Sequence, residues 1–240
     1  MTSNEIIFLL IAFLGSIVAG SIGFGIAIIV VPLSSLVLPI KKAAVIVNIA
    51  FAAMNLSNLI IFRKHANWKL ILIISLGAIP ATILGSTLLV YAPTRLLEIL
   101  LGLIAILYII NDHFNFLKNI KLNNYGIAGG GALYGFFSGI IGTGDIIKAI
   151  FLTHIGLRKE NFIATMAGSA IINNIVKAIV YTKFALMTKT DIPLIIALVV
   201  CAILGVSIGQ RFVHKVSSET FKKMVIAVLF VASIKLLFFP

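Results

Sequence analysis

The chain has 240 residues, of which 61% are hydrophobic and 11% charged, and its formal net charge is +12. A soluble globular domain has about half apolar and a quarter charged residues, so this composition excludes that class and indicates a protein embedded in a lipid bilayer. The 19 Lys and Arg residues are scattered between apolar runs. This distribution is typical of loop anchors at a membrane surface and argues against a nucleic-acid partner, which would need a basic stripe with interleaved aromatic residues.

Eight apolar runs lie between charged residues, four in each half of the chain. Several reach the roughly 20 residues that cross a bilayer as a helix, and none has the alternating polarity of a barrel strand. The sequence therefore predicts an all-α polytopic membrane protein. The runs cover residues 5–40, 43–62, 70–91, 96–110, 125–156, 162–184, 192–213 and 221–239.

The first and fifth runs are too long for one straight helix. They hold 36 and 32 residues, which as helices would measure about 50 Å against a hydrocarbon core of about 30 Å. Each carries a Gly-x-x-Gly-x-Gly pattern near its middle, at residues 20–25 and 139–144. Because glycine readily adopts unwound or left-handed backbone, we predict that each run is a broken helix or a hairpin that returns to its own side.

The two glycine patterns lie 119 residues apart, about half the length of the chain. The same offset pairs Asn55 with Asn174 and Lys64 with Lys183. We interpret this match as an internal duplication within a single transmembrane domain, residues 1–240, with one repeat at about 5–111 and the other at about 125–239. Glycine-rich breaks in corresponding segments of two halves are typical of a secondary transporter that binds its substrate at the repeat interface.

Loop charges distinguish crossing runs from hairpins. If every run crosses the membrane, seven cations fall on one side and nine on the other, which favours neither orientation. If the first and fifth runs are hairpins, eleven fall on one side and five on the other, and the positive-inside rule places the eleven in the cytoplasm. We therefore predict two inverted repeats with both termini outside. The eleven are Arg63, Lys64, Lys69, Lys118, Lys121, Arg158, Lys159, Arg211, Lys215, Lys222 and Lys223, and the five are Lys41, Lys42, Arg95, Lys183 and Lys189.

The glycine breaks are candidate binding sites. A helix broken at membrane depth frees backbone N–H groups that lipid cannot satisfy, and the positive end of the next half-helix favours an anion. The alternative is that these glycines only allow close helix packing, as we expect for the pairs Gly135/Gly139 and Gly205/Gly209. The substrate-binding residues predicted from the breaks are Gly23, Phe24, Gly25, Gly142, Thr143 and Gly144.

Asp145 and Lys148 follow the second glycine pattern at a spacing of i, i+3, which puts them on one helix face inside an apolar run. Charges at that depth are costly and should face a cavity or each other. Two interpretations are open, a structural ion pair and a proton-coupling site. The corresponding residues of the first half are Ile26 and Ile29, so only one half carries this pair.

Further polar residues interrupt the second run at Asn55 and the sixth run at Asn173, Asn174 and Lys177. An amide offers hydrogen-bond donors and acceptors and an ammonium offers positive charge, so both suit an oxyanion. The alternative for asparagine is interhelical hydrogen bonding that holds the bundle together, whereas a midspan lysine is rarely structural only. We predict that Asn55, Asn174 and Lys177 contribute to the substrate site.

The usual signatures of other activities are missing from the sequence. It has no Walker A motif, no recognisable nucleophile elbow and no pair of histidines at metal-ligand spacing. We therefore expect no ATP hydrolysis, no enzymatic activity, no cofactor and no metal.

Several short motifs follow one another in a set order along the chain. They are a glycine-rich first segment ending in Val31, Pro32 and Leu33, the Lys41-Lys42 turn, Asn55, the series from Gly135 to Gly144, Gly168-Ser169 and Asn173-Asn174. Over about residues 6–238, this order resembles the sulfite exporter TauE/SafE family of membrane permeases. The resemblance implies transport of sulfite, sulfonates or related small organosulfur anions across the cytoplasmic membrane of a prokaryote, without ATP hydrolysis. Asp145 departs from the family pattern, in which an apolar or small residue is expected.

The residues and the resemblance together predict a secondary permease for a small anion, in which the two halves rock to alternate access. The direction of transport and the substrate cannot be read from the sequence, and a homo-oligomer is left open. The competing hypothesis is a membrane assembly or scaffold subunit that transports nothing, which would apply if the midspan polar residues serve only as helix contacts.

Overall fold

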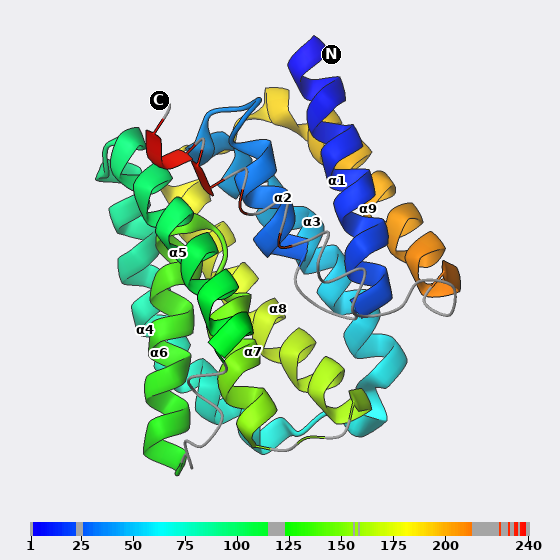
Figure 1. Ribbon diagram of the computed structural model, residues 1–240, viewed down its shortest axis with the longest axis vertical. Helices are drawn as coiled ribbons and strands as arrows, with labels where there is room; N and C mark the ends of the chain where they lie inside the picture. Colours follow the sequence, from blue (N-terminus) through cyan, green and yellow to red (C-terminus); the bar gives the residue numbers. More distant parts are fainter. Residues whose placement is uncertain are drawn as a thin grey trace.

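The computed structural model describes residues 2–22, 26–114, 123–155, 157, 159–212, 226, 230, 233–234 and 236–238 (Figure 1). All regular structure in these residues is helical, so the all-α prediction is confirmed for the described part of the chain. The α-helices are α1 (Ser3–Ile22), α2 (Ile26–Ser34), α3 (Ile40–Phe62), α4 (Trp68–Tyr91), α5 (Thr94–Phe114), α6 (Asn124–Ile141), α7 (Asp145–His154), α8 (Lys159–Lys183) and α9 (Ile192–Phe212), and the 3-10 helices are η1 (Arg63–His65) and η2 (Lys189–Asp191).

Four segments of the described residues are long and apolar enough to cross a membrane. They are Ile40–His65, Trp68–Tyr91, Glu160–Lys183 and Lys189–Gly209, with mean hydropathies of 2.0, 2.0, 1.5 and 2.7. Large apolar side chains remain exposed on their outer faces, among them Leu76 of α4, Ile179 of α8 and Ile196 of α9. In water such a surface would be unfavourable, whereas against lipid it is the expected one. The protein is therefore a multi-pass membrane protein.

The fifth apolar run forms two helices that pack as a hairpin. Helix α6 ends at Ile141, Gly142 adopts the left-handed conformation with φ 81°, and α7 begins at Asp145. Beyond the turn, Gly144 faces the backbone of Tyr134 and Ser138, and Phe151 places its ring against Gly130. The contacts move back along α6 as α7 proceeds, so the two helices are antiparallel. The first run likewise yields α1 and the short α2, while residues 23–25 between them lie outside the described residues.

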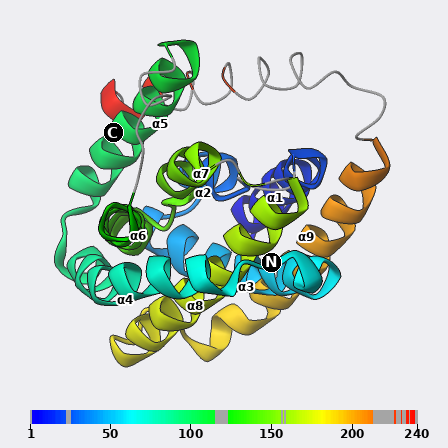
Figure 2. The same ribbon diagram turned by 90° about the horizontal axis from the view of Figure 1, so that it is seen from below.

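Two pairs of parallel helices flank the molecule, α4 with α6 and α1 with α9 (Figures 1 and 2). Both pairs meet through glycines that face the backbone of the partner helix. Gly135 and Gly139 of α6 face α4 around Thr82, and Gly205 and Gly209 of α9 face α1 around Ile17. A side chain at any of these four positions would collide with the opposing helix. The packing role predicted for these two glycine pairs is confirmed.

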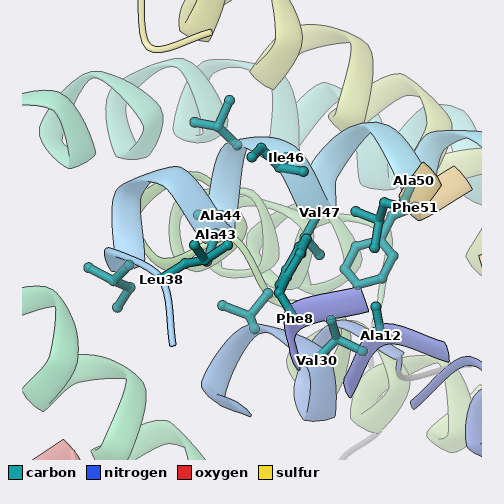
Figure 3. Close-up of a cluster of buried hydrophobic side chains, with 14 of the residues drawn as sticks. Phe8, Ala12, Val30, Leu38, Ala43, Ala44, Ile46, Val47, Ala50 and Phe51 are labelled. Atoms are coloured by element: carbon teal, nitrogen blue, oxygen red, sulfur yellow. The ribbon is translucent and has the colours of Figure 1, made fainter. Parts of the chain in front are cut away.

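Helices α3 and α8 lie in the middle and pack against each other, while α3 also packs against α9 and α8 against α4. Figure 3 shows part of the apolar core that forms on α3, with Val47 and Phe51 of α3 facing Phe8 and Ala12 of α1 and Val30 of α2. These five side chains are all less than a tenth exposed. The core fixes the α1–α2 segment against α3, and it leaves the opposite side of α3 in contact with α8.

The helices run in two directions. In Figure 1, α1, α3 and α9 descend from the end that carries the N-terminus, and α4, α6 and α8 rise towards it. At the upper end Lys41, in the first turn of α3, donates to the carbonyl of Val90 at the end of α4 (2.8 Å). At the lower end Asn161, in the first turn of α8, donates to the carbonyl of His65 just before α4 (2.9 Å).

Two contacts at opposite ends join a central helix to a distant connection. Lys42 forms an ion pair with Asp191 in the α8–α9 connection, with Nζ 3.0 Å from Oδ1. Asn161 makes its hydrogen bond to His65 in the α3–α4 connection. Lys42 and Asn161 are 119 residues apart, the offset that separates the two glycine patterns. We call these the Lys42 contact and the Asn161 contact.

Candidate functional site

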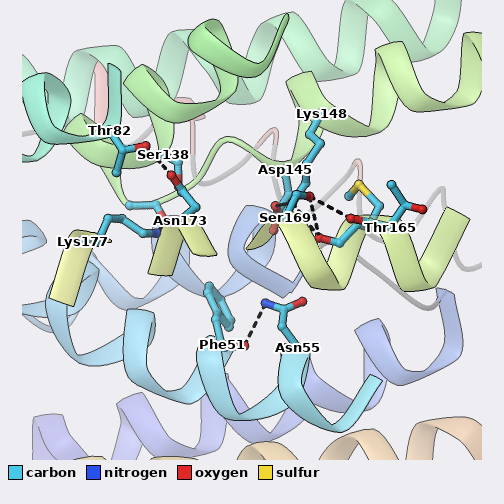
Figure 4. A network of polar contacts seen from close by, with 12 residues as sticks. Phe51, Asn55, Thr82, Ser138, Asp145, Lys148, Thr165, Ser169, Asn173 and Lys177 are labelled. Carbon is cyan, nitrogen blue, oxygen red and sulfur yellow. Dashed lines mark hydrogen bonds and ion pairs between the residues drawn. The ribbon is translucent and has the colours of Figure 1, made fainter. Parts of the chain in front are cut away.

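A buried polar cluster surrounds the turn between α6 and α7, where α3 and α8 meet it. Its members are Gly142 and Thr143 of the turn, Asn48 of α3, and Asn174 and Lys177 of α8. We call this set the turn cluster. All four side chains are at most 4% exposed. Figure 4 shows Lys177 and Asn173 near each other on α8.

Direct contacts join the turn to both central helices. Lys177 donates from Nζ to the carbonyl of Gly142 at 3.5 Å, and Asn48 donates from Nδ2 to the carbonyl of Asn174 at 3.2 Å. A Cβ at Gly142 would lie only 2.9 Å from Cβ of Ala44, which precedes Asn48 by one helical turn. The five members of the turn cluster are therefore neighbours around one crossing of elements.

Lys177 is a buried lysine that forms no direct ion pair with a carboxylate of the described residues. Its side chain is 1% exposed, and its one hydrogen bond, to Gly142, is at the long limit for such a contact. Among the described residues, none of the three ion pairs includes it. Burial of an unpaired ammonium is costly, and an anion bound next to it would remove that cost.

Three further polar atoms of the turn cluster are buried without a hydrogen-bond partner. They are Oγ1 of Thr143, Nδ2 of Asn174 and Oδ1 of Asn48. More than nine-tenths of buried polar groups in native proteins are paired, so a group of unpaired ones beside an unpaired charge needs an explanation. A polar ligand in contact with them supplies one.

The start of α7 adds a favourable field at the same place. Helix α7 begins at Asp145, directly after the Thr143–Gly144 peptide, and its first internal hydrogen bond joins Lys148 N to Gly144 O (3.3 Å). The preceding N–H groups have no intrahelical acceptor, and the helix dipole places partial positive charge there. The turn cluster can therefore hold a small anion through one ammonium, one hydroxyl, one amide and the N-terminus of a helix.

Lys148, the second buried lysine, is fully partnered. Its Nζ lies 3.2 Å from Oδ1 of Asp145, donates to the carbonyl of Met166 at 3.0 Å, and sits 4.2 Å from the centre of the Tyr134 ring. The ion pair at spacing i, i+3 is thus present, with a cation–π contact that sequence reasoning missed. Since Asp145 pairs directly with Lys148, Lys177 is the buried lysine of the described residues that has no ion-pair partner to compete with a ligand.

Asn173 links three helices next to the turn cluster. It donates from Nδ2 to Oγ of Ser138 on α6 at 2.8 Å, and its Oδ1 accepts from the hydroxyl of Thr82 on α4 (Figure 4). Both ends of the amide are therefore satisfied. This is the interhelical role that the sequence left open for asparagine.

The comparison with known families gives one match. The model of the family described as Sulfite exporter TauE/SafE matches residues 8–236. The chain belongs to the sulfite exporter TauE/SafE family. Membership places the chain among membrane transporters described as sulfite exporters, a family of transporters and not of enzymes. No curated protein and no solved structure matches the chain.

The remaining predicted residues of this permease have different surroundings. Gly23, Phe24 and Gly25 lie outside the described residues. Asn55 is half-buried and donates to the carbonyl of Phe51 in its own helix at 2.8 Å, without a hydrogen bond to the turn cluster. In Figure 4 it lies on α3, apart from Lys177.

Asn48 is the member of the turn cluster that sequence reasoning missed. It interrupts the second apolar run in the same way as Asn55 does, but its counterpart in the other half is Ala167, so the duplication draws no attention to it. Gly144 contributes differently from Gly142 because it packs against α6. Among the described residues, no group of His, Cys, Asp or Glu could hold a metal ion.

Proposed function

We propose that this permease carries sulfite, a sulfonate or a related small oxyanion across the cytoplasmic membrane as a secondary transporter, and that the turn cluster binds the anion. The observation that carries the proposal is the buried, unpaired charge of Lys177 beside the unpartnered atoms of Thr143 and Asn174. Lys177 supplies the charge, Thr143 and Asn174 donate hydrogen bonds, and the N–H groups at the start of α7 hold the oxygens.

The proposal includes two inverted repeats within one transmembrane domain. At an offset of 119 residues, α1 to α4 correspond to α6 to α9. Exchanging the halves converts the α4–α6 pair into the α9–α1 pair, and corresponding helices run in opposite directions in Figure 1. This relation supports alternating access by rocking of one half against the other around the site.

The distribution of loop cations along the sequence, eleven against five, supports an orientation for these repeats. Arg63, Lys64 and Lys69 lie in or next to η1 at the lower end of Figure 1, and Lys42 and Lys189 belong to the upper end, with η2. The positive-inside rule then assigns the lower end to the cytoplasm. Under this proposal Gly23, Phe24, Gly25 and Asn55 belong to the corresponding region of the first half.

Replacement of Lys177 by methionine tests the site. We expect Lys177→Met to raise the half-saturating concentration of the transported anion about ten- to a hundredfold, because one charge-assisted contact is lost. The measurement is counterflow in proteoliposomes that contain purified protein, with a panel of sulfite, sulfonates and carboxylates. Lys183→Met is the matched control, since Lys183 lies in the exposed last turn of the same helix.

Two outcomes would contradict the proposal. Equal half-saturating concentrations in Lys177→Met and the wild type would remove the turn cluster as the binding site. Absence of flux for every solute with the wild-type chain alone would favour the non-transporting assembly subunit.

A further inference from the structure

The turn cluster contains a buried hydrogen-bond acceptor without a partner, Oδ1 of Asn48, as well as donors. This acceptor limits which anions can bind well. We propose that the site selects a singly charged oxyanion that still carries a proton, hydrogensulfite in preference to sulfite or a sulfonate, and that Asn48 accepts the hydrogen bond from that proton. This inference rests on the proposed function of the turn cluster. It adds the protonation state of the substrate and a specificity-determining residue.

The orientation of the Asn48 amide is determined by its partner. Its Nδ2 lies 3.2 Å from the carbonyl oxygen of Asn174, which can only accept a hydrogen bond. The other end of the amide is therefore the oxygen, and Oδ1 is buried without a donor. With Asn48 only 1% exposed, that oxygen is closed off from bulk water.

An acceptor in this position discriminates between anions by their hydrogen atoms. Hydrogensulfite brings an O–H group from which Oδ1 of Asn48 can accept a hydrogen bond, whereas sulfite and sulfonates bring only acceptor oxygens. With those ligands Oδ1 would stay unpaired and would face negative oxygen atoms. A site built around a hydrogen bond rejects ligands that cannot make it, because the buried polar group is left without a partner.

The charge of the site points to a monoanion. Lys148 is neutralised by Asp145 at 3.2 Å, so the uncompensated charge among the described residues of the site is that of Lys177. A monoanion balances this charge, while a dianion would leave a net negative charge in a low-dielectric interior. Charge and hydrogen bonding thus favour the same species.

The first test compares two ligands across the protonation step of sulfite. Half-saturating concentrations for counterflow are measured with total sulfite and with methanesulfonate, one pH unit below and one above the pKa at which hydrogensulfite loses its proton. If only the protonated form binds, the value for sulfite rises about tenfold between the two conditions, in proportion to the loss of the competent species. Methanesulfonate is a monoanion at both pH values, so the ratio of the sulfite value to the methanesulfonate value should rise about tenfold between them.

Methanesulfonate also controls for titration of the protein. The titratable side chains around the turn cluster are Lys177 on α8, Asp145 and Lys148 on α7, Tyr134 on α6 and Tyr181 on α8. A change in the protonation of any of these side chains would alter the half-saturating concentrations of both ligands. Protonation of the ligand alters that of sulfite alone.

The second test uses Asn48→Leu, with Ser57→Leu at an exposed position of the same helix as the control. Loss of the acceptor should raise the half-saturating concentration of hydrogensulfite about tenfold. It should leave that of methanesulfonate unchanged or lower it, because an unpaired acceptor no longer faces the sulfonate oxygens. Ser57→Leu should change neither value. If Asn48→Leu fails to fold, the wild-type comparison across pH decides the question alone.

The outcomes separate this inference from the proposed function. If both ligands bind at both pH values with constant affinity, and Lys177→Met weakens both, the anion site stands and selection by protonation is refuted. If neither ligand is carried, or Lys177→Met has no effect, the proposed function fails and this inference fails with it.

Discussion

Two buried lysines with different surroundings define the chemistry of the site at the scale of single residues. Lys148 has a carboxylate, a carbonyl and an aromatic face as partners, while Lys177 has one distant carbonyl. Both occur in apolar segments, where a charge costs several kcal/mol unless it is paired or used. The first is paired and the second is free to meet a ligand.

We expect Asp145→Asn to destabilise the protein by roughly 3 kcal/mol, because it leaves Lys148 buried without a counterion. The double variant Asp145→Asn with Lys148→Met should recover most of that loss, since the uncompensated charge is then removed. Thermal unfolding of detergent-purified protein measures both. If the double variant does not recover and Asp145→Asn abolishes pH-driven accumulation while exchange persists, Asp145 carries protons instead.

The sequence was informative about charges and less so about amides. Asp145, Lys148 and Lys177 could be recognised because a charge in an apolar run has few structural uses. Asn48 and Asn173 could not be assigned, since asparagine serves equally as a helix contact and as a ligand contact. Only the neighbours distinguish them: Asn173 has a partner at each end of its amide, and Asn48 has a partner at one end.

At the scale of elements, the α6–α7 turn depends on Gly142. Its φ of 81° lies in the left-handed region, and any Cβ there would also press on Ala44. Chain length alone showed that the fifth run could not be one straight helix. The loop charges favoured a hairpin, but they could not show which faces of α6 and α7 meet, because this depends on contacts such as those of Gly144 with Tyr134 and of Gly130 with Phe151.

We expect Gly142→Val to abolish transport while the protein still inserts. A β-branched residue resists positive φ at a cost of about 1 to 3 kcal/mol, and it would displace the N–H groups at the start of α7. Gly129→Val is the matched control, because a Cβ at Gly129 meets nothing within 4 Å. Flux per inserted molecule is the measurement. Normal flux in Gly142→Val would contradict the binding role and would show that the turn serves only helix packing.

At the scale of the whole molecule, the hairpin arrangement makes a clear prediction of sidedness. Lys64 and Lys189 would share one side of the membrane if all eight runs crossed it, and they lie on opposite sides if the first and fifth runs are hairpins. The chain has a single cysteine, so Lys64→Cys and Lys189→Cys can each be made in a Cys201→Ser background. We expect an impermeant thiol reagent outside intact cells to label residue 189 and not residue 64. Labelling of both from outside would contradict the inverted repeats.

The Lys42 contact and the Asn161 contact stabilise the two ends of the molecule by different kinds of interaction. The first is an ion pair with a partly exposed lysine, and the second is a neutral hydrogen bond to a main-chain carbonyl. Salt screens the first and leaves the second unchanged. We therefore expect a higher ionic strength on the side of Lys42 to weaken the Lys42 contact and to favour opening of the carrier towards that side.

Because a partly exposed pair contributes up to about 1 kcal/mol, the bias should amount to at most about fivefold. We expect Asp191→Asn to reproduce at low salt the opening that high salt causes in the wild type, and to abolish any further response to salt. To measure opening, Ala44, which lies next to Gly142, is replaced by cysteine. The rate at which an impermeant thiol reagent labels this cysteine from one side reports opening towards that side. If the labelling rate does not vary with salt when Asp191 is retained, screening of the Lys42 contact has no effect on opening, and the prediction is wrong.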